Sequence, residues 1–521
     1  MAKMAHCEAD VRILLHRSPD RTRREPLWRQ IQLHIERLIS QRLLAPGVKL
    51  PATRELARDL GVNRTTVALA YDELVAGGWA RAHVGQGTFV ADQVPAAVEA
   101  ARPAAPRLDW TGSLSKSAQV IAADARRRLA YSQVPRPAPG VISFAGGMPD
   151  ASLFPTDAFR RVLNRVIRDE GRELLQYYPA RGYPPLREHL AGYLLRFGLE
   201  ARPEEILIVN GSQQGFDLVA RTLLDPGDFV AIEEPSYPRA MRVFRAYGAQ
   251  LLPVPMVAGG LHVESLERLL ERQSPKLVYC QPSAHNPTGL SMSAAARQRL
   301  VDLAVRHRLP IVEDGFDGTL FYGARPPAPL KSLDVSGLVI YIGTFSKILF
   351  PGLRLGWIVA PPELVERLEM AKDLADIHTS PILQAAVFHF CRQRLLDRHQ
   401  ARVLRESARR RNALVAALAR RMPSGVTWTE SQGGFSLLVT LPEGMDSVTL
   451  LEQAITRGVA FTPGNAFFVD GGGEHTLRLS FSAIPVSQID EGIKCLAEAI
   501  REAQRQPERA APVAQPGVPL V

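Results

Sequence analysis

Between residues 141 and about 504, the sequence alternates short apolar runs with helical patterns. The apolar runs occupy residues 206–209, 229–232, 277–280, 311–312 and 338–342. Strands that are apolar on both faces need cover on both sides, and helices between successive strands provide it. The alternation therefore predicts an α/β domain whose mostly parallel sheet is covered by helices.

A lysine and an arginine follow the last of these runs. Lys347 comes shortly after the run 338–342, and Arg354 lies seven residues further on. A charged lysine at the end of a buried strand is costly unless it is neutral or covalently tied up as an imine. A nearby arginine suits a dianionic phosphate. Together they suggest a Schiff-base lysine that holds pyridoxal 5'-phosphate.

Other positions of the same region could serve this cofactor. Ser212 and Gln213 open a helical pattern directly after a strand, and a helix N-terminus presents free N–H groups to a phosphate. Asp314 ends an apolar run and could keep a pyridine nitrogen protonated. Asn286 could donate to the phenolic oxygen, and Tyr237 could stack on the ring. Taken singly, each residue could equally belong to a turn or a helix cap.

Positive charge is concentrated at the start of the chain. Of the formal net charge of +10, the first 140 residues carry +8. This asymmetry favours a polyanionic partner, nucleic acid before membrane, although a solvated basic surface is the alternative. No run of eighteen apolar residues occurs, and Cys7, Cys280, Cys391 and Cys495 lack metal-ligand spacing. We therefore expect a cytoplasmic protein with neither a membrane span nor a metal site.

The first ninety residues show the pattern of a helix-turn-helix with a wing. Helical patterns cover residues 26–44, 52–60 and 64–76, and Gly61 separates the second from the third. Asn63 can cap the third helix. Two short strands, 79–83 and 88–91, flank a glycine-rich turn and predict a hairpin wing. The polar start of the third helix is where base and phosphate contacts would come from.

The motifs of this module resemble the winged helix-turn-helix of GntR-type repressors. They are PLWRQI (26–31), LPATRELA (50–57), LGVNRTTV (60–67), AYDEL (70–74) and GQGTFV (85–90), in the same order as in that family. The resemblance implies that this module binds double-stranded operator DNA. The residues expected at the DNA are Arg54, Asn63, Arg64, Thr65, Thr66, Gly85 and Gly87.

The larger region resembles the fold-type I aminotransferases. The resemblance rests on the succession Tyr177, Gly182, Ser212–Gln214, Tyr237, Asn286–Gly289, Asp314, Lys347, Arg354 and Arg478. It implies that Lys347 forms the Schiff base, that Asp314 pairs with the pyridine nitrogen, and that Asn286 binds the phenolate. Around the phosphate we expect Ser212, Gln213, Ser346 and Arg354, with Tyr177 reaching the phosphate of the partner subunit's cofactor.

Two arginines are expected to bind a ligand, and one position departs from the family. By the resemblance, Arg478 grips a ligand carboxylate, and Arg239 lies close enough to Tyr237 in the sequence to help. Two residues after Asp314 the family usually has a tyrosine that donates to the phenolate, but this chain has Phe316. The loss of this donor should alter the absorption of the cofactor and weaken any transamination.

The two resemblances together indicate the MocR family of bacterial regulators. They imply an N-terminal extension (1–23), a winged helix-turn-helix (24–91), an Ala/Pro-rich linker (92–140), an aminotransferase-like domain (141–504) and a disordered tail (505–521). In such a protein the large domain senses an amine or amino-acid effector and forms a head-to-tail homodimer. One alternative is a working aminotransferase with an appended DNA-binding module. The other is a dimerisation domain that has lost its cofactor.

Overall fold

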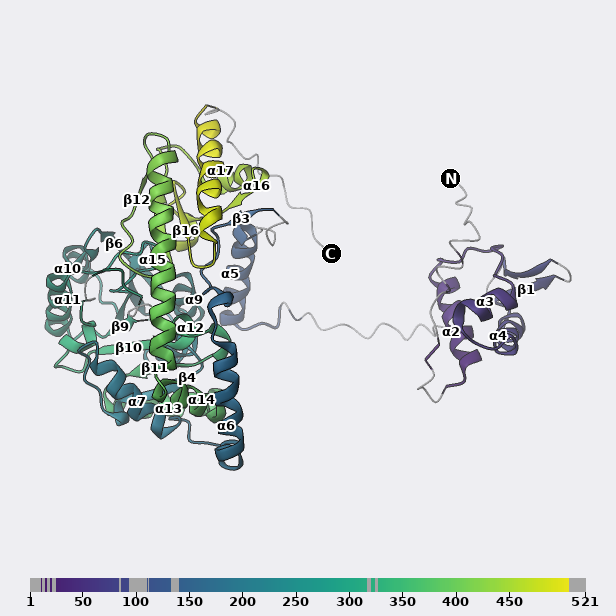
Figure 1. Cartoon of the computed structure of the whole chain (residues 1–521), viewed down its shortest axis with the longest axis horizontal. Helices are drawn as coiled ribbons and strands as arrows, with labels where there is room; N and C mark the ends of the chain where they lie inside the picture. The colour runs from purple at the N-terminus through teal and green to yellow at the C-terminus, as the bar shows by residue number, and fades with distance from the viewer. Residues whose placement is uncertain are drawn as a thin grey trace. The chain divides into compact units, whose positions relative to one another are not determined.

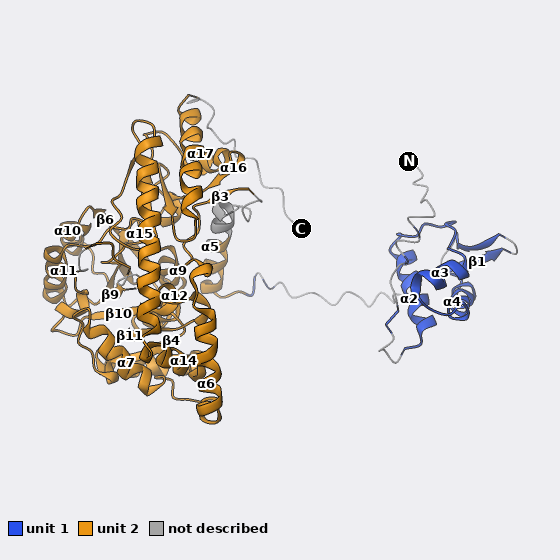
Figure 2. Cartoon of the chain, in the orientation of Figure 1, with its two compact units in different colours: residues 1–113 blue, residues 114–521 orange. Residues whose placement is uncertain are grey.

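The chain forms two compact units, residues 1–113 and residues 114–521 (Figure 2). The computed structural model describes residues 25–83, 86–92, 112–132, 140–315, 320–323 and 327–505, together with Val11, Leu15, Pro19, Asp20 and Trp110. Most of the predicted N-terminal extension and nearly all of the predicted tail lie outside the described residues. Within them, every helix is too short or too polar to cross a membrane.

The small unit is a three-helix bundle with a β-hairpin. Its elements are α2 (Leu27–Ser40), α3 (Thr53–Leu60), α4 (Arg64–Ala76), β1 (Ala80–His83) and β2 (Gly87–Val90), and the two strands pair antiparallel. Gly61 ends α3 in a left-handed conformation with φ of 64°, which favours glycine. The predicted winged helix-turn-helix is therefore confirmed, with boundaries shifted by a few residues.

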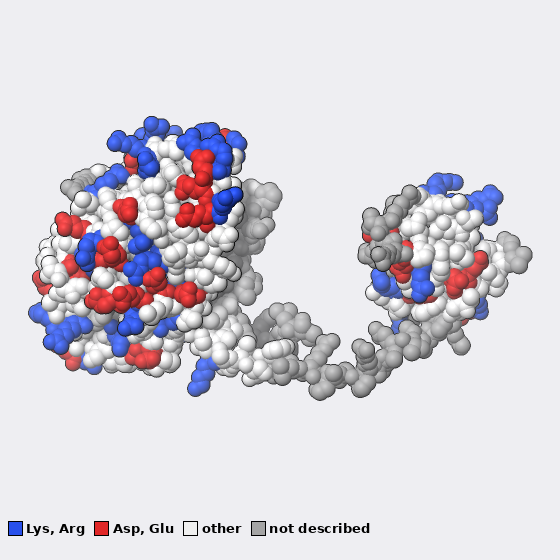
Figure 3. All heavy atoms as spheres, turned by 90° about the horizontal axis from the view of Figure 1, so that it is seen from below, with Lys and Arg blue, Asp and Glu red and all other residues white. Residues whose placement is uncertain are grey.

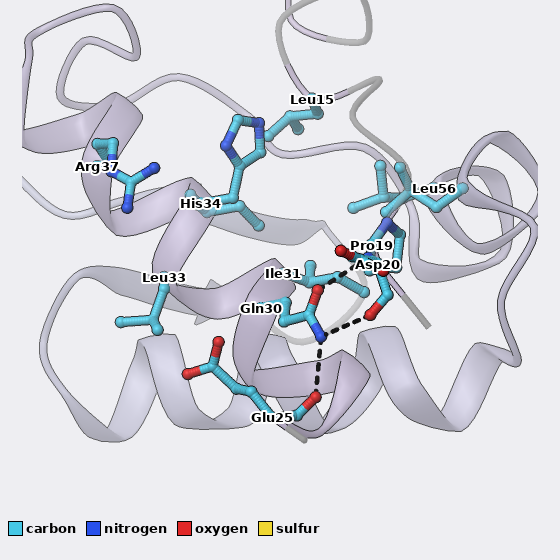
Figure 4. A pocket seen from close by; sticks show the side chains of 12 residues that line it. Leu15, Pro19, Asp20, Glu25, Gln30, Ile31, Leu33, His34, Arg37 and Leu56 are labelled. Atoms are coloured by element: carbon cyan, nitrogen blue, oxygen red, sulfur yellow. Dashed lines mark hydrogen bonds between the residues drawn. The ribbon is translucent and has the colours of Figure 1, made fainter. Parts of the chain in front are cut away.

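The core of the small unit includes side chains from the predicted N-terminal extension. Val11 and Leu15 are both buried in the same cluster as Ile35 and Val67. Gln30 also holds Asp20, because its amide bonds both the backbone N–H and the carbonyl of that residue (Figure 4). A pocket of about 220 Å³ lies beside α2, but none of the predicted DNA-contact residues lines it.

The large unit is built on an eight-stranded sheet with the order β4-β11-β10-β9-β8-β5-β6-β7. The strands are β4 (Ile206–Val209), β5 (Phe229–Glu234), β6 (Gln250–Val257), β7 (Gly260–Leu261), β8 (Leu277–Cys280), β9 (Ile311–Asp314), β10 (Val339–Thr344) and β11 (Gly356–Val359). Neighbouring strands from β10 to β6 run parallel, whereas β11 and β7 are antiparallel to their neighbours. The mostly parallel sheet is confirmed.

Helices cover both faces of this sheet, as the apolar strands require. One face packs against α8 (Ser212–Leu223), α9 (Pro238–Ala246) and α13 (Pro362–Asp376). The other face packs against α6 (Thr156–Leu174), α7 (Pro184–Leu195), α10 (Val263–Leu270), α11 (Ala294–His307) and α14 (Pro381–Arg392). Short helical turns occupy Ala151–Leu153, Pro203–Glu205, Leu330–Leu333, Pro351–Leu353 and Gly464–Phe467.

A smaller sheet and three helices complete the large unit. The strands β12 (Thr427–Trp428), β13 (Ser436–Thr440), β16 (Thr476–Ser480) and β15 (Thr462–Pro463) form an antiparallel sheet, and β14 (Val459–Ala460) pairs in parallel with β3 (Ile142–Ser143). They share one core with α15 (Leu395–Arg421), α16 (Ser447–Thr456) and α17 (Val486–Arg505). The long helix α15 contacts both α14 and α17 (Figure 1).

Charged side chains of both signs are spread over the visible face of the large unit, as Figure 3 shows. A face with interspersed charges of both signs is typical of a solvated surface. Most of the net positive charge of the chain lies in its first 140 residues. The visible face of the large unit, in contrast, shows charges of both signs (Figure 3).

One helix, α5 (Lys116–Ser132), lies within the predicted linker. Its 17 residues interrupt the Ala/Pro-rich linker expected there. It packs against α9 of the large unit, and the Ser117 hydroxyl donates to the Ala246 carbonyl at 2.7 Å. The part of the predicted linker that forms α5 therefore packs on the large unit.

Candidate cofactor site and DNA-binding face

The carboxyl ends of five strands meet at one edge of the large sheet. Lys347 lies in the short helix α12 (Phe345–Ile348), which follows β10 directly. Asp314 ends the adjacent parallel strand β9 and is in register with Ile342 of β10. The segments after β4, β5 and β8 reach the same edge and carry Ser212, Tyr237 and Asn286. In open α/β sheets, ligands bind at this edge.

Lys347 is half-buried, and a backbone carbonyl orients its amine. The Thr344 hydroxyl caps α12 by accepting the Ser346 backbone N–H at 3.1 Å, which fixes the turn that carries the lysine. The Lys347 Nζ donates to the Gly147 carbonyl at 2.7 Å. A lysine amine held at this edge of the sheet can form a covalent imine.

A cradle for an anion lies beside Lys347, at the N-terminus of α8. Gly211 precedes this helix with φ of 78° and ψ of 169°, and Ser212 and Gln213 form its first turn. The Arg354 guanidinium lies over this turn. It donates to the Asn210 carbonyl at 3.0 Å and to the Ser346 hydroxyl at 3.4 Å. Ser212, Gln213, Ser346 and Arg354 are therefore gathered as predicted.

The backbone at the start of the cradle leaves room for a phosphate. A Cβ atom on Gly211 would lie only 2.7 Å from a guanidinium nitrogen of Arg354, so only glycine leaves room there. The free N–H groups and the dipole of a helix N-terminus attract a dianion, and the arginine adds a full charge. The residues present therefore fit the phosphate of pyridoxal phosphate.

We expect Gly211→Ala to raise the dissociation constant for pyridoxal phosphate about tenfold or more. The reason is that the backbone conformation of Gly211 is nearly exclusive to glycine and costs other residues roughly 1–3 kcal/mol. The new methyl group would also displace Arg354 from the cradle. Titration of the cofactor-free protein with pyridoxal phosphate measures the constant. Gly227→Ala is the control, because Gly227 also has positive φ but its Cβ would meet nothing within 4 Å. An equal loss of affinity in both variants would contradict the prediction.

Asp314 is buried and receives two hydrogen bonds on one oxygen. The Tyr279 hydroxyl and the Gln281 Nε2 donate to its Oδ2 at 2.7 and 2.8 Å. Donors to a carboxylate favour its ionised form, which is the form that holds a proton on a pyridine nitrogen. Burial raises the pKa of the Tyr279 hydroxyl, so Tyr279 remains a donor at neutral pH. The arrangement fits the role expected for Asp314.

Arg478 joins the cofactor edge to a cleft of about 720 Å³. Its guanidinium donates to the Ala145 carbonyl at 2.8 Å and to the Asn286 Oδ1 at 3.3 Å, and it stacks on the Phe467 ring. Burial lowers the pKa of this guanidinium to about 10, so it remains charged at neutral pH. Its Nε lacks a hydrogen-bond partner among the described residues. A carboxylate in the cleft could occupy these donors.

The same cleft contains Tyr237 and Arg239 of the predicted site. Tyr237 caps the N-terminus of α9, and Arg239 is exposed in its first turn. Two further arginines of α9, Arg242 and Arg245, line the cleft with them, and Asp470 is the acidic residue among its lining. The cleft is therefore strongly cationic and suits an anionic ligand.

Two further positions singled out in the sequence are Tyr177 and Phe316. Tyr177 is 81% exposed and contacts the His378 ring. Its predicted role at a partner subunit stays a prediction. Phe316 lies outside the described residues, and the same is true of Gly85 in the wing.

Four of the predicted DNA-contact residues, Asn63 to Thr66, lie at the start of α4. The Asn63 side chain accepts the Thr65 backbone N–H at 3.4 Å, which confirms the predicted cap. Arg54, Arg64 and Thr65 are exposed, and the Arg64 Nε lies 3.5 Å from the Thr53 hydroxyl. Thr66 is partly buried, and Gly87 is exposed at the start of β2 with φ of 113°. Short polar and cationic side chains on one helix N-terminus suit contact with bases and phosphates.

Sequence reasoning missed several residues of the site. Tyr279 and Gln281 lie in and just after a strand, and Arg242 and Arg245 continue the helix that carries Arg239. The repeat of arginine every third residue in α9 was a visible signal of a cationic helix. Tyr279 and Gln281 offered no such signal, because only strand pairing brings β8 beside β9.

The fold and the site define a winged helix-turn-helix joined to an aminotransferase-like domain whose cofactor is pyridoxal phosphate. Residues 27–90 match the family of bacterial regulatory proteins of the gntR type, and residues 141–496 match the aminotransferase class I and II family. The chain belongs to the MocR-type transcriptional regulators, which combine these two domains.

The similar proteins include a regulator that matches most of the chain and aminotransferases that match the large domain. The chain is 34% identical to the probable rhizopine catabolism regulatory protein MocR of Rhizobium meliloti, over 92% of this chain and 95% of that protein. It is 38% identical to the 2-aminoadipate transaminase of Thermus thermophilus, over 76% of this chain and 98% of the enzyme. The crystal structure of the α-aminoadipate aminotransferase LysN from Thermus thermophilus, complexed with a phosphopyridoxyl-leucine, matches with 37% identity and a TM-score of 0.70. That match covers 76% of this chain and 100% of LysN.

Proposed function

We propose that this regulator senses an amine or amino acid at Lys347 and changes its operator affinity in response. The observation that carries the proposal is the position of Lys347 beside an intact phosphate cradle and a cationic cleft. Bound pyridoxal phosphate supplies an aldehyde that amines attack. An incoming amine that takes the place of Lys347 frees the lysine side chain, and the ligand stabilises whichever arrangement of the protein binds it better.

The cleft residues indicate the chemistry of the effector. Arg478 offers donors close to Asn286, and Arg239 and Arg242 add charge at the side of α9. An amino compound with a carboxylate could place its amine at Lys347 and its carboxylate at Arg478. The proposed effector is therefore an acidic or zwitterionic amino compound, and Tyr237 and Phe467 provide aromatic surface for the rest of it.

The route from the effector to the linker runs through α9 and α5. Helix α9 contributes Tyr237 and its arginines to the cleft, and its C-terminal end accepts the hydrogen bond from Ser117 of α5. Helix α5 is the first described helix of the large unit after the residues that connect the two units in the sequence. A shift of α9 on ligand binding would therefore move α5, and with it the attachment point of the linker.

We expect Ser117→Ala to reduce the effector-dependent change in operator affinity about two- to tenfold, because the variant loses one hydrogen bond between α5 and α9. The spectral response of the cofactor to the same effector should remain. Operator titrations with and without effector give the ratio. Ser336→Ala, in an exposed turn of the large unit, is the control. A full response in Ser117→Ala would show that the signal takes another route.

Exposed apolar side chains support a homodimer. Leu374 of α13 is 86% exposed, and Ile377, Leu175 and Tyr177 are also largely exposed. The Arg181–Glu369 ion pair ties the segment after Tyr177 to α13, so these side chains belong to one region of the surface. A second subunit that covers this region would bury them, and we infer a head-to-tail dimer in which Tyr177 reaches the cofactor phosphate of the partner.

Catalytic transamination is the second candidate function. Lys347, Asp314 and Arg478 are all retained, and the transaminase relative from Thermus thermophilus is 38% identical over 76% of this chain. A freed lysine can act as a general base. Assays with amino donors and keto-acid acceptors distinguish the two functions, since sustained multiple turnover would favour the enzyme and a single stoichiometric conversion the regulator.

The main test is a spectral titration of the purified, cofactor-loaded protein with a panel of amino compounds. Each compound that perturbs the visible band is then tested for its effect on operator binding. A compound that changes both signals supports the proposal. If every compound that reacts at Lys347 leaves operator affinity unchanged, the large unit is not the sensor.

We expect Arg64→Ala to weaken operator binding by about 1–3 kcal/mol while leaving the cofactor spectrum unchanged. Arg64 is exposed at the N-terminus of α4, where a recognition helix makes its contacts. Electrophoretic mobility shifts at fixed salt measure the affinity. Arg42→Ala, in the exposed turn after α2, is the control. Unchanged binding by Arg64→Ala would place the recognition surface elsewhere.

A further inference from the structure

A buried glutamine connects two of the residues assigned to the cofactor ring. Gln281 directly follows β8 and is 1% exposed. Its Nε2 donates to the Asp314 Oδ2 at 2.8 Å, and its Oε1 accepts the Asn286 backbone N–H at 3.1 Å. One planar amide therefore bonds both the residue assigned to the pyridine nitrogen and the residue assigned to the phenolic oxygen.

The surroundings hold Gln281 in this position without adding charge to it. Its backbone N–H donates to the Glu233 Oε2 at 2.7 Å. Burial raises the pKa of the Glu233 carboxyl to about 8, so this group is mainly neutral at pH 7. Burial also lowers the pKa of the His285 imidazole to about 3, and its Nε2 lies 3.5 Å from the Glu233 carboxyl. At pH 7, Glu233 therefore adds little negative charge beside Asp314.

Other titratable groups near Asp314 come from the neighbouring strands and α11. Tyr279 of β8 donates to Asp314, and Glu313 of β9 points to the other side of the sheet, where its carboxyl accepts the Leu330 and Lys331 backbone N–H groups. Arg297 of α11 is buried and donates to the carbonyls of Met292, Pro282 and Ala328. Gln281 is therefore the neutral side chain that both donates to Asp314 and accepts from Asn286.

The contacts of Asn286 extend this connection to the effector cleft. The Asn286 Oδ1 accepts from the Arg478 Nη1 at 3.3 Å, while its backbone N–H is held by Gln281. Asp314, Gln281, Asn286 and Arg478 thus form one hydrogen-bonded series, from the pyridine side of the ring to the arginine assigned to the ligand carboxylate. Residues joined in one network act together more than separate contacts would.

We propose that Gln281 is a positioning residue, which holds Asp314 where it would meet the pyridine nitrogen and Asn286 where it would meet the phenolic oxygen, and so sets the pH at which the Lys347 nitrogen loses its proton in the cofactor-loaded protein. The proposal rests on the cofactor site described above. An amide suits this place, because a carboxylate would repel Asp314, whereas an apolar side chain would remove one donor from Asp314 and the acceptor from the Asn286 backbone N–H.

The test compares the pH midpoint of the visible absorption band in the cofactor-loaded wild type and in Gln281→Leu. Without the Gln281 donor, Asp314 holds the proton on the pyridine nitrogen less firmly. A less protonated ring repels the proton on the Lys347 nitrogen less, so we expect the midpoint to rise by about one pH unit. Gln281→Glu is isosteric and should also raise the midpoint, because two adjacent carboxyls share a proton.

Gln384→Leu is the matched control. Gln384 is also fully buried and bonded on both sides, with its Oε1 accepting the Tyr183 N–H at 2.7 Å and its Nε2 donating to the Thr379 carbonyl at 2.8 Å. It should lose a comparable free energy of unfolding and keep the wild-type midpoint. A wild-type midpoint in both Gln281 variants, or an equal shift in Gln384→Leu, overturns the role of Gln281. Absence of any visible band in the loaded wild type overturns the cofactor site itself and the proposal with it.

Discussion

Lys347→Ala is expected to abolish the visible absorption band of the cofactor and its fixation by borohydride. The Lys347 Nζ is the amine that stands at the carboxyl edge of the sheet, next to the phosphate cradle. Alanine cannot form the covalent bond, whereas the cradle of Ser346 and Arg354 remains, so pyridoxal phosphate should still bind without covalent attachment. Absorption spectra and mass spectrometry after reduction measure the two outcomes.

The same variant separates sensing from DNA binding. Operator affinity without effector should change by less than about twofold. Lys347 and the DNA-binding helices lie in separate units, and distant sites usually act independently. The response to the effector should disappear. Lys494→Ala is the control, because Lys494 is an exposed lysine of α17 paired with Glu491. A visible, reducible adduct in Lys347→Ala would assign the Schiff base to another lysine.

Arg478→Ala is expected to weaken a carboxylate-bearing effector about 10- to 150-fold, while pyridoxal phosphate remains bound. The estimate follows from the loss of charge-assisted hydrogen bonds, each worth roughly 1.5–3 kcal/mol. The guanidinium is positioned by Phe467, Asn286 and the Ala145 carbonyl, and the proposed phosphate cradle has a separate arginine, Arg354. The effector concentration that half-saturates the spectral change gives the affinity.

Two further variants sharpen this result. Arg478→Lys keeps the charge and loses the fork geometry, so it should retain part of the response. Arg306→Ala removes an exposed arginine that pairs with Glu267 on the surface and should respond fully. An unimpaired response of Arg478→Ala to a carboxylate-bearing effector would mean that this ligand binds outside the cleft.

Local sequence patterns predicted the helices and strands because helix capping and the burial of one face depend on residues close together in the sequence. Asn63 was expected to cap α4, and its side chain does accept the Thr65 N–H. Val67, Ala70, Tyr71 and Leu74 follow helical spacing, and all four are buried. The apolar runs became the central strands, because residues apolar on both faces are stable only under helices. Lys347, Asp314 and Ser212 were singled out because each ends or follows an apolar run, and the parallel strands do bring these ends to one edge.

Contacts between distant segments were not predictable in the same way. The hydrogen bond from Gln281 to Asp314 depends on the pairing of β8 with β9, and the bond from Ser117 to Ala246 depends on the packing of α5 against α9. The burial of Val11 and Leu15 in the core of the small unit likewise depends on tertiary packing. These contacts carry no repeat or spacing in the sequence that would indicate them.

The sequence alone, through its local patterns and the resemblance of its ordered motifs to two families, predicted the two domains, the cofactor and the lysine expected to bind it. Each of these depends on secondary structure or on chemistry that one short segment contains. Tertiary structure alone decided that Gln281 bridges Asp314 and Asn286, that Arg478 and α9 line one cleft, and that α5 rests on α9. The physical reason is that hydrogen bonds and burial depend on distances in space, and strand order and helix packing set those distances between residues far apart in the sequence.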